Sequence, residues 1–80
     1  MEQNYPNPST TISFSLPRAS FVTLKIHNLL GEEVATLVHE QRAAGEQRVH
    51  WQPHDLPSGV YVYRLQVGAF VKSKKLVFLR

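Results

Sequence analysis

Apolar and polar residues alternate along most of the chain, in segments separated by Gly, Pro and Asn. A period of two places successive side chains on opposite faces, so each segment predicts a strand with one buried face. Six segments of this kind are expected to be strands: 10–16, 21–27, 33–38, 47–51, 59–67 and 70–79. No segment has a convincing helical period. Short strands at this spacing predict an all-β, antiparallel sandwich of six strands, or seven if the last segment or the N-terminal arm splits.

Two of the segments depart from simple alternation. In the third, Val34 and Leu37 are three residues apart. We expect a β-bulge there, because a helical turn this short is marginally stable. The sixth segment is apolar throughout 76–79, which is typical of a strand that is covered on both faces.

Turn-forming residues separate the segments. Asn28–Gly31, Ala43–Gly45 and Gly68–Ala69 are expected to reverse the chain. Gly59 follows Pro57 and Ser58, and we expect a positive φ at Gly59 to let the chain re-enter the sheet. Residues 1–9 contain two prolines and are expected to form an extended arm.

Composition narrows the possible functions. The 80 residues suffice for one domain, 1–80, and with no cysteine they form no disulfide. The net charge is only +3, and the basic residues cluster only at Lys72, Lys74 and Lys75, so we do not expect nucleic-acid binding. No apolar run is long enough to cross a bilayer, so membrane insertion is not expected. No signal peptide is recognisable, and the start is expected to be that of a domain excised from a longer protein.

Candidate reactive residues are few. The four histidines (His27, His39, His50 and His54) lack the ligand spacing of a zinc site and are interpreted as solvated surface residues. Trp51, Tyr61 and Tyr63 could form a carbohydrate-stacking platform, but their phase favours a place in the core. No nucleophile has a neighbouring base. We therefore expect no catalysis, no metal and no cofactor.

The lysine run at 72–75 has two interpretations that the sequence does not separate. It could bind an acidic partner. Alternatively, it could protect an edge strand from pairing with another chain.

Several motifs occur in a specific order over almost the whole chain. These are Asn4-Tyr5-Pro6-Asn7-Pro8, Thr11–Pro17, Val22–Ile26 followed by Leu30–Val34, Ala44-Gly45 before Val49–Trp51, Leu56–Tyr61, and finally Lys74–Leu79. In this order they resemble the type A C-terminal sorting domain of type IX secretion. They are also similar to the Ig-like domain of the flagellar hook-capping protein.

The resemblance implies an Ig-like sandwich that directs a bacterial cargo protein through the type IX secretion system. The implied partners are outer-membrane translocon components and an upstream cargo domain, and the implied location is the cell surface or exterior, reached through the periplasm. The positions that it implicates in recognition, or in holding the recognised shape, are Ser58, Gly59, Tyr61, Lys74, Lys75, Leu76 and Val77.

The chain also departs from the family pattern. The family usually has Tyr-Asp where this chain has His27-Asn28, and Arg where it has Glu32. Any role that needs an acidic residue at this turn is therefore in doubt. Two other functions stay open: a structural assembly or adhesion module like the hook cap, and a small hydrolase or carbohydrate-binding module.

Overall fold

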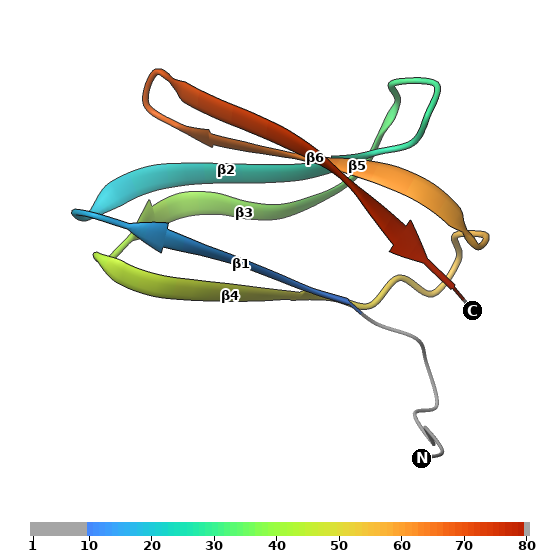
Figure 1. Cartoon of the computed structure of the whole chain (residues 1–80), viewed down its shortest axis with the longest axis horizontal. Coiled ribbons are helices and arrows are strands. Elements are labelled where there is room, and N and C mark those ends of the chain that lie inside the picture. The colour runs from blue at the N-terminus through green and yellow to red at the C-terminus, as the bar shows by residue number, and fades with distance from the viewer. Residues whose placement is uncertain (1–9, 80) are drawn as a thin grey trace, which may run out of the picture.

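The computed structural model describes residues 10–79, which form six strands and no helix (Figure 1). The strands are β1 (Thr10–Leu16), β2 (Ser20–His27), β3 (Glu33–Arg42), β4 (Gly45–Trp51), β5 (Gly59–Val67) and β6 (Phe70–Phe78). β1 and β4 pair in a small sheet, and a larger sheet has the order β3-β2-β5-β6. All pairs are antiparallel, so the expected sandwich is confirmed. The expected arm, 1–9, lies outside the described residues.

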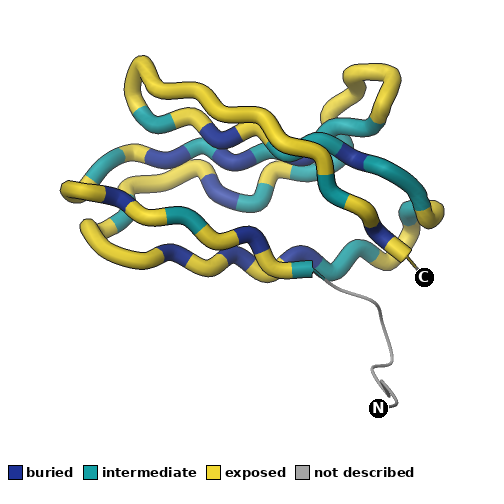
Figure 2. The backbone as a smooth tube through the Cα atoms, viewed as in Figure 1, coloured by how far each residue is buried: buried dark blue, intermediate teal, exposed yellow. Residues whose placement is uncertain are grey.

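The alternation in the sequence decides which face of each strand is buried. Side chains two residues apart turn toward the space between the sheets, and the dark segments in Figure 2 follow this period. Four of them are almost completely buried: Phe78, Leu24, Ile26 and Val22. The rest of the core consists of Ile12, Leu16, Val38, Val49, Trp51, Tyr61 and Leu65.

The irregular phase of β3 comes from bulges, as expected. Leu24 of β2 faces Val38 of β3, but the next residue of β2, Lys25, faces Thr36, so Leu37 is the extra residue. A second shift between Ile26 and His27 leaves out Val34. An extra residue reverses the direction of the side chains that follow, which explains why Val34 and Leu37 broke the alternation. β3 also continues to Arg42, four residues past the predicted end.

β6 is not covered on both faces, contrary to the expectation from its apolar end. It is an edge strand of the large sheet, and only Phe78 in it is buried. Val77 is 60% exposed and Leu79 is 69% exposed. Because Phe78 points into the core, Val77 and Leu79 point to the outer face of the large sheet, which no strand within residues 10–79 covers. The apolar run therefore combines the core residue Phe78 and the half-buried Leu76 with two residues that face solvent.

Glycines with positive φ lie in the turns that the sequence indicated. Gly31, Gly45 and Gly68 have φ values of 86°, 116° and 59°. Gly68 is the first of the two residues between β5 and β6, and a type II′ hairpin needs a positive φ there. Gly59 has no positive φ, so the explanation predicted for this residue was wrong.

Candidate recognition surface

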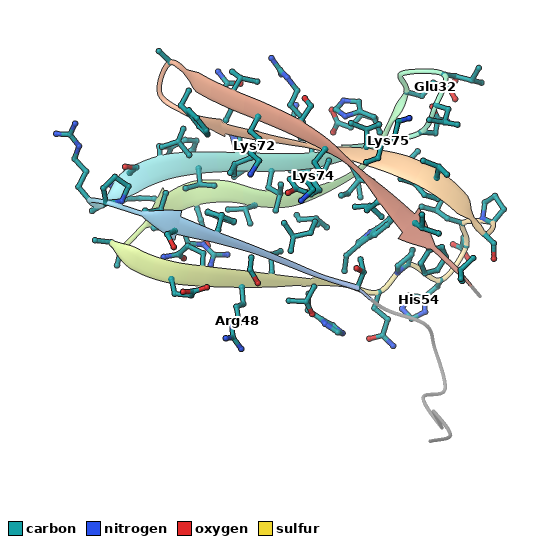
Figure 3. The ribbon with its side chains drawn as sticks, viewed as in Figure 1. Glu32, Arg48, His54, Lys72, Lys74 and Lys75 are labelled. Atoms are coloured by element: carbon teal, nitrogen blue, oxygen red, sulfur yellow. The ribbon has the colours of Figure 1, made fainter. Side chains whose placement is uncertain are left out.

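Pairing between β5 and β6 places the clustered lysines on two faces of the sheet. Lys72 pairs with Leu65 and Lys74 with Tyr63, whereas Lys75 pairs with Val62. Because directly paired residues lie on the same face, Lys72 and Lys74 are on the core side and Lys75 is on the outer side. Figure 3 shows Lys72 and Lys74 on the side of β6 toward β1, and Lys75 on the opposite side.

The C-terminal end of β6 is anchored in the core by aromatic packing. Phe78 is 1% exposed, and its ring centroid lies 5.5 Å from that of Trp51. Trp51 also makes an edge contact with Tyr61, with centroids 5.5 Å apart. Such aromatic contacts stabilise a fold beyond the area that they bury. β6 is thus held at its C-terminal end, while its lysines are exposed.

Tyr61 belongs to the core, as the phase of β5 indicated. Its ring is buried, and its hydroxyl donates a hydrogen bond of 2.7 Å to the carbonyl oxygen of Pro57. A tyrosine that bonds to the backbone four residues upstream resembles the tyrosine corner of Ig-like sandwiches. This bond fixes the loop that contains Ser58 relative to β5.

The seven predicted site residues gather along the β5–β6 pair but differ in exposure. Ser58, Lys74, Lys75 and Val77 are exposed, and Gly59 is half-buried. Tyr61 is buried, and Leu76, which pairs with Tyr61, is partly buried against the core.

A side chain at Gly59 is expected to be tolerated. A Cβ built there meets no atom within 4 Å, and the backbone needs no positive φ. Gly59→Ala should therefore change the free energy of unfolding by less than about 1 kcal/mol, and any change should favour the fold. Urea denaturation measures this change. Gly31→Ala is the control, and it should destabilise the fold because alanine is strained at a positive φ. Equal losses of stability in the two variants would show that Gly59 does not tolerate a side chain.

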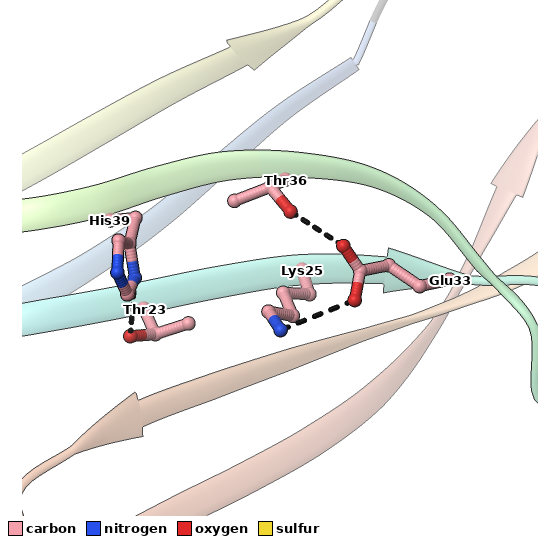
Figure 4. Close-up of polar contacts among 5 residues, drawn as sticks. All are labelled: Thr23, Lys25, Glu33, Thr36 and His39. Carbon is pink, nitrogen blue, oxygen red and sulfur yellow. Dashed lines mark hydrogen bonds and ion pairs between the residues drawn. The ribbon is translucent and has the colours of Figure 1, made fainter.

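A polar network covers part of the outer face of the large sheet (Figure 4). Glu33 accepts a hydrogen bond of 2.7 Å from the Thr36 hydroxyl and forms an ion pair of 3.2 Å with Lys25. Thr23 Oγ1 lies 3.4 Å from His39 Nδ1. The hydrogen bond from Thr36, followed by the contact with Lys25, lowers the pKa of Glu33 below its ordinary value of 4.5.

The lowered pKa of Glu33 predicts a dependence of stability on pH. A carboxylate with a depressed folded-state pKa stabilises the fold above its unfolded pKa, and this contribution is lost as pH falls through the folded value. The loss should therefore begin as pH falls below about 4.5. Unfolding curves measured as the pH is lowered through this range should show a smaller loss of stability for Glu33→Gln than for the wild type. An identical pH dependence in the two proteins would contradict the assignment.

The loop between β2 and β3 depends on the side chain of Asn28. Its Oδ1 accepts hydrogen bonds from the backbone N–H groups of Leu30 and Glu32, at 2.9 and 3.0 Å. Its Nδ2 donates to Glu32 Oε1 at 2.7 Å. The amide and carboxylate thus form a pair where the family usually has Asp and Arg. Asp and Arg can likewise pair an acceptor with a donor, so this contact accounts for the departures at positions 28 and 32 but not for the one at His27.

Asn28→Asp should destabilise the loop, because it places two carboxylates where the amide now donates to Glu32. We expect a loss of about 0.2–1 kcal/mol in the free energy of unfolding, since the two side chains interact at the surface. Adding Glu32→Arg should restore most of the loss, since Arg can donate to Asp. Urea denaturation of both single variants and of the double variant gives the coupling free energy between positions 28 and 32. Additive effects of the two changes would show that the pair does not act as a unit.

Other candidate chemistry is not assembled in the part of the chain that the structure describes. No three His, Asp or Glu side chains among residues 10–79 come together as metal ligands. His27 and His50 lie on different sheets. Trp51 and Tyr61 are buried and Tyr63 is half-buried against the core, so the three rings do not form an exposed stacking platform for a carbohydrate. No helix within residues 10–79 is long and apolar enough to span a membrane.

Sequence reasoning missed several exposed apolar side chains. Leu29 and Leu30 project from the tip of the β2–β3 loop, and Phe70 and Val71 lie at the start of β6. A loop rich in leucine was a visible signal for the first pair. The exposure of Phe70 depends on how far the small sheet extends, whereas Val71 lies on the outer face of the large sheet; no local pattern reveals either.

One of the comparisons with known proteins gives a match. Comparison with curated proteins and with solved structures gives no match. The family model described as "Secretion system C-terminal sorting domain" matches residues 3–79, nearly the whole chain. The match includes both the anchored end of β6 and its exposed lysines. The chain therefore belongs to the family of C-terminal sorting domains, which act as sorting signals for type IX secretion of bacterial cargo proteins.

Proposed function

We propose that outer-membrane components of the type IX translocon recognise this domain at the exposed part of β6 and the adjoining start of β5. The observation that carries the proposal is the contrast within β6. Phe78 is fixed in the core, whereas Lys74, Lys75 and Val77 are exposed beside it. A partner can therefore bind these side chains without first ordering the strand, and preorganisation of this kind lowers the cost of binding.

The proposed site residues divide into two roles. Lys74, Lys75, Val77 and Ser58 are proposed to contact the translocon, because their side chains are exposed. Gly59 is proposed to let the partner approach the backbone, since a Cβ there would point into open space. Tyr61 and Leu76 are proposed to hold the shape of the site, because they pack into or against the core.

In this proposal residues 1–80 act as one non-catalytic module that follows a cargo domain in a longer protein. The cargo would reach the periplasm by a separate signal and then cross the outer membrane to the surface or exterior. Recognition by protein–protein contact requires no cofactor, nucleic acid or membrane insertion. The alternative of a structural assembly or adhesion module gains no support from the described residues or from the family match.

The test is to fuse residues 1–80 to the C-terminus of a reporter that carries a standard periplasmic leader. In a cell with an active type IX system, the reporter should appear outside the outer membrane. In the same strain without the translocon, it should stay in the periplasm. Periplasmic retention of a folded fusion in the competent cell would refute the proposal.

Deleting the end of β6 would be a poor test. Removing residues 74–80 also removes Phe78, which is almost completely buried. The deletion would unfold the domain and so would not distinguish loss of recognition from loss of structure. Substitutions at exposed positions avoid this ambiguity.

A further inference from the structure

The two sheets expose four strand edges, and three of these have features that discourage pairing with another chain. β3 carries two bulges and the charged residues Glu33, Glu40 and Arg42. β4 carries Glu46 and Arg48, and β6 carries its three lysines. Bulges and charged side chains are the usual means by which proteins protect sheet edges. The fourth edge, along β1, has neither.

β1 is well suited to accept another strand. Among residues 10–79 it pairs only with β4, and Thr10–Leu16 contains no charge, no proline, no glycine and no bulge. Thr, Ile and Phe are residues that favour extended structure. Along a free edge, N–H and C=O groups point away from the sheet and can bind a further strand through main-chain hydrogen bonds.

A groove lies beside this edge at the C-terminal end of β1. It has a volume of about 670 Å³ and lies between the β1–β2 turn and the β5–β6 hairpin. Its apolar lining includes Leu16, Phe21, Leu65, Val67 and Phe70. The groove exists because no third strand of the small sheet covers this part of β5 and β6. A strand added to β1 would lie over it.

Charge indicates what the added strand would carry. Lys72 and Lys74 follow Phe70 along the same face of β6, so they continue the groove toward the N-terminal end of β1. Arg18 lines the groove, and no acidic residue of the part of the chain that the structure describes does so. A matching strand would thus present apolar side chains near Leu16 and acidic side chains near Lys72 and Lys74.

A second folded copy does not fit this space. If β1 paired with β1 of another copy, each copy would bring its own large sheet beneath the shared small sheet. Leu65, Val67 and Phe70 of β5 and β6 already line the groove at the C-terminal end of β1. The two large sheets would then occupy the same volume. An extended segment without a second sheet beneath it avoids this conflict.

We propose that the free edge of β1 is a strand-addition site for an extended segment of a partner protein, antiparallel to β1. The side chains of this segment that face inward are apolar at the end beside Leu16 and acidic beside Lys72 and Lys74. This site is distinct from the translocon surface proposed above, with which it shares only Lys74. Its test measures binding in solution and does not depend on export.

The probe is a capped peptide, Val-Thr-Val-Thr-Glu-Thr-Glu, titrated into the 1–80 chain. We expect binding that slows amide hydrogen exchange within residues 10–16. A peptide with Lys in place of Glu, and one with alternate backbone nitrogens methylated, should each bind at least tenfold more weakly. The first comparison tests the charge preference, and the second tests the main-chain hydrogen bonds.

Matched variants locate the contact. Lys72→Glu together with Lys74→Glu should reverse the preference, so that the Lys peptide binds more tightly than the Glu peptide. Lys75→Glu is the control, since Lys75 faces the opposite side and its change should alter the preference less than twofold. Circular dichroism confirms that each variant is folded.

Three results would overturn the proposal. The first is unchanged exchange within residues 10–16 at peptide concentrations in the millimolar range. The second is protection of β3, β4 or β6 in place of β1. The third is protection of β1 that increases with protein concentration in the absence of peptide, because this would identify a second copy as the occupant.

Discussion

Phe78→Ala is expected to unfold the domain or bring it to the edge of unfolding. Phe78 is 1% exposed and packs against Trp51 and Tyr61. Truncating a buried phenylalanine to alanine costs about 3–5 kcal/mol, through lost burial and the cavity that remains. A domain of this size has little stability to spare. Urea denaturation followed by circular dichroism measures the loss.

Val77→Ala is the matched control for this prediction. Val77 is adjacent in sequence and in the same strand, but its side chain is 60% exposed. Its truncation should cost about 0.5 kcal/mol or less, as surface substitutions usually do. If Phe78→Ala were as stable as Val77→Ala, the end of β6 would not be anchored in the core.

Lys74→Glu combined with Lys75→Glu is expected to stop export of a reporter fusion while leaving the domain folded. Both side chains are exposed, so the free energy of unfolding should change by less than about 1 kcal/mol. Export should fall at least tenfold, because two cations proposed to contact the translocon become anions. The fraction of reporter outside the cell measures export, and urea denaturation of the purified fusion measures stability.

Arg48→Glu is the control for the single charge reversal Lys75→Glu. Arg48 lies on β4 of the small sheet and points away from the sandwich (Figure 3). Lys75→Glu changes the net charge by the same amount on the proposed contact surface. The lysine variant should lose export and the arginine variant should keep it. Equal loss of export in the two would show that net charge controls secretion, and normal export of both would show that Lys75 is not a contact.

These two predictions separate the roles that β6 combines. Its C-terminal end stabilises the sandwich, and its exposed lysines present the proposed recognition surface. A variant such as Phe78→Ala should lose export because the fold is lost, whereas a lysine variant should lose export with the fold intact. Measuring stability and export on the same variants therefore distinguishes structure from recognition.

Local patterns were sufficient to predict most of the fold. Strict alternation in Thr10–Leu16 and Phe21–His27 identified both strands and their buried faces, because the core lies on one side of each. The break in phase at Val34 and Leu37 predicted the bulges of β3. Where prediction failed, the burial of the residue depended on tertiary structure. Val77 is exposed because it lies on the outer face of the large sheet, which no strand within residues 10–79 covers, and no pattern within β6 contains that information.

The candidate site was predicted less completely. The family motifs indicated the residues of β5 and β6, but the faces on which Lys74 and Lys75 lie depend on the register with β5. The expectation of a positive φ at Gly59 was wrong, because β5 begins at this residue with an ordinary negative φ. The bond between Asn28 and Glu32 joins two departures from the family pattern that looked unrelated in the sequence.

Site-specific crosslinking tests the central claim most directly. A photoreactive amino acid replaces Val77 in one reporter fusion and Arg48 in another, and both are irradiated in cells with an active type IX system. We expect position 77 to crosslink to an outer-membrane translocon component and position 48 to give no such product. Crosslinking from position 48 alone would contradict the account, since the translocon would then contact the small sheet and not the edge strand β6.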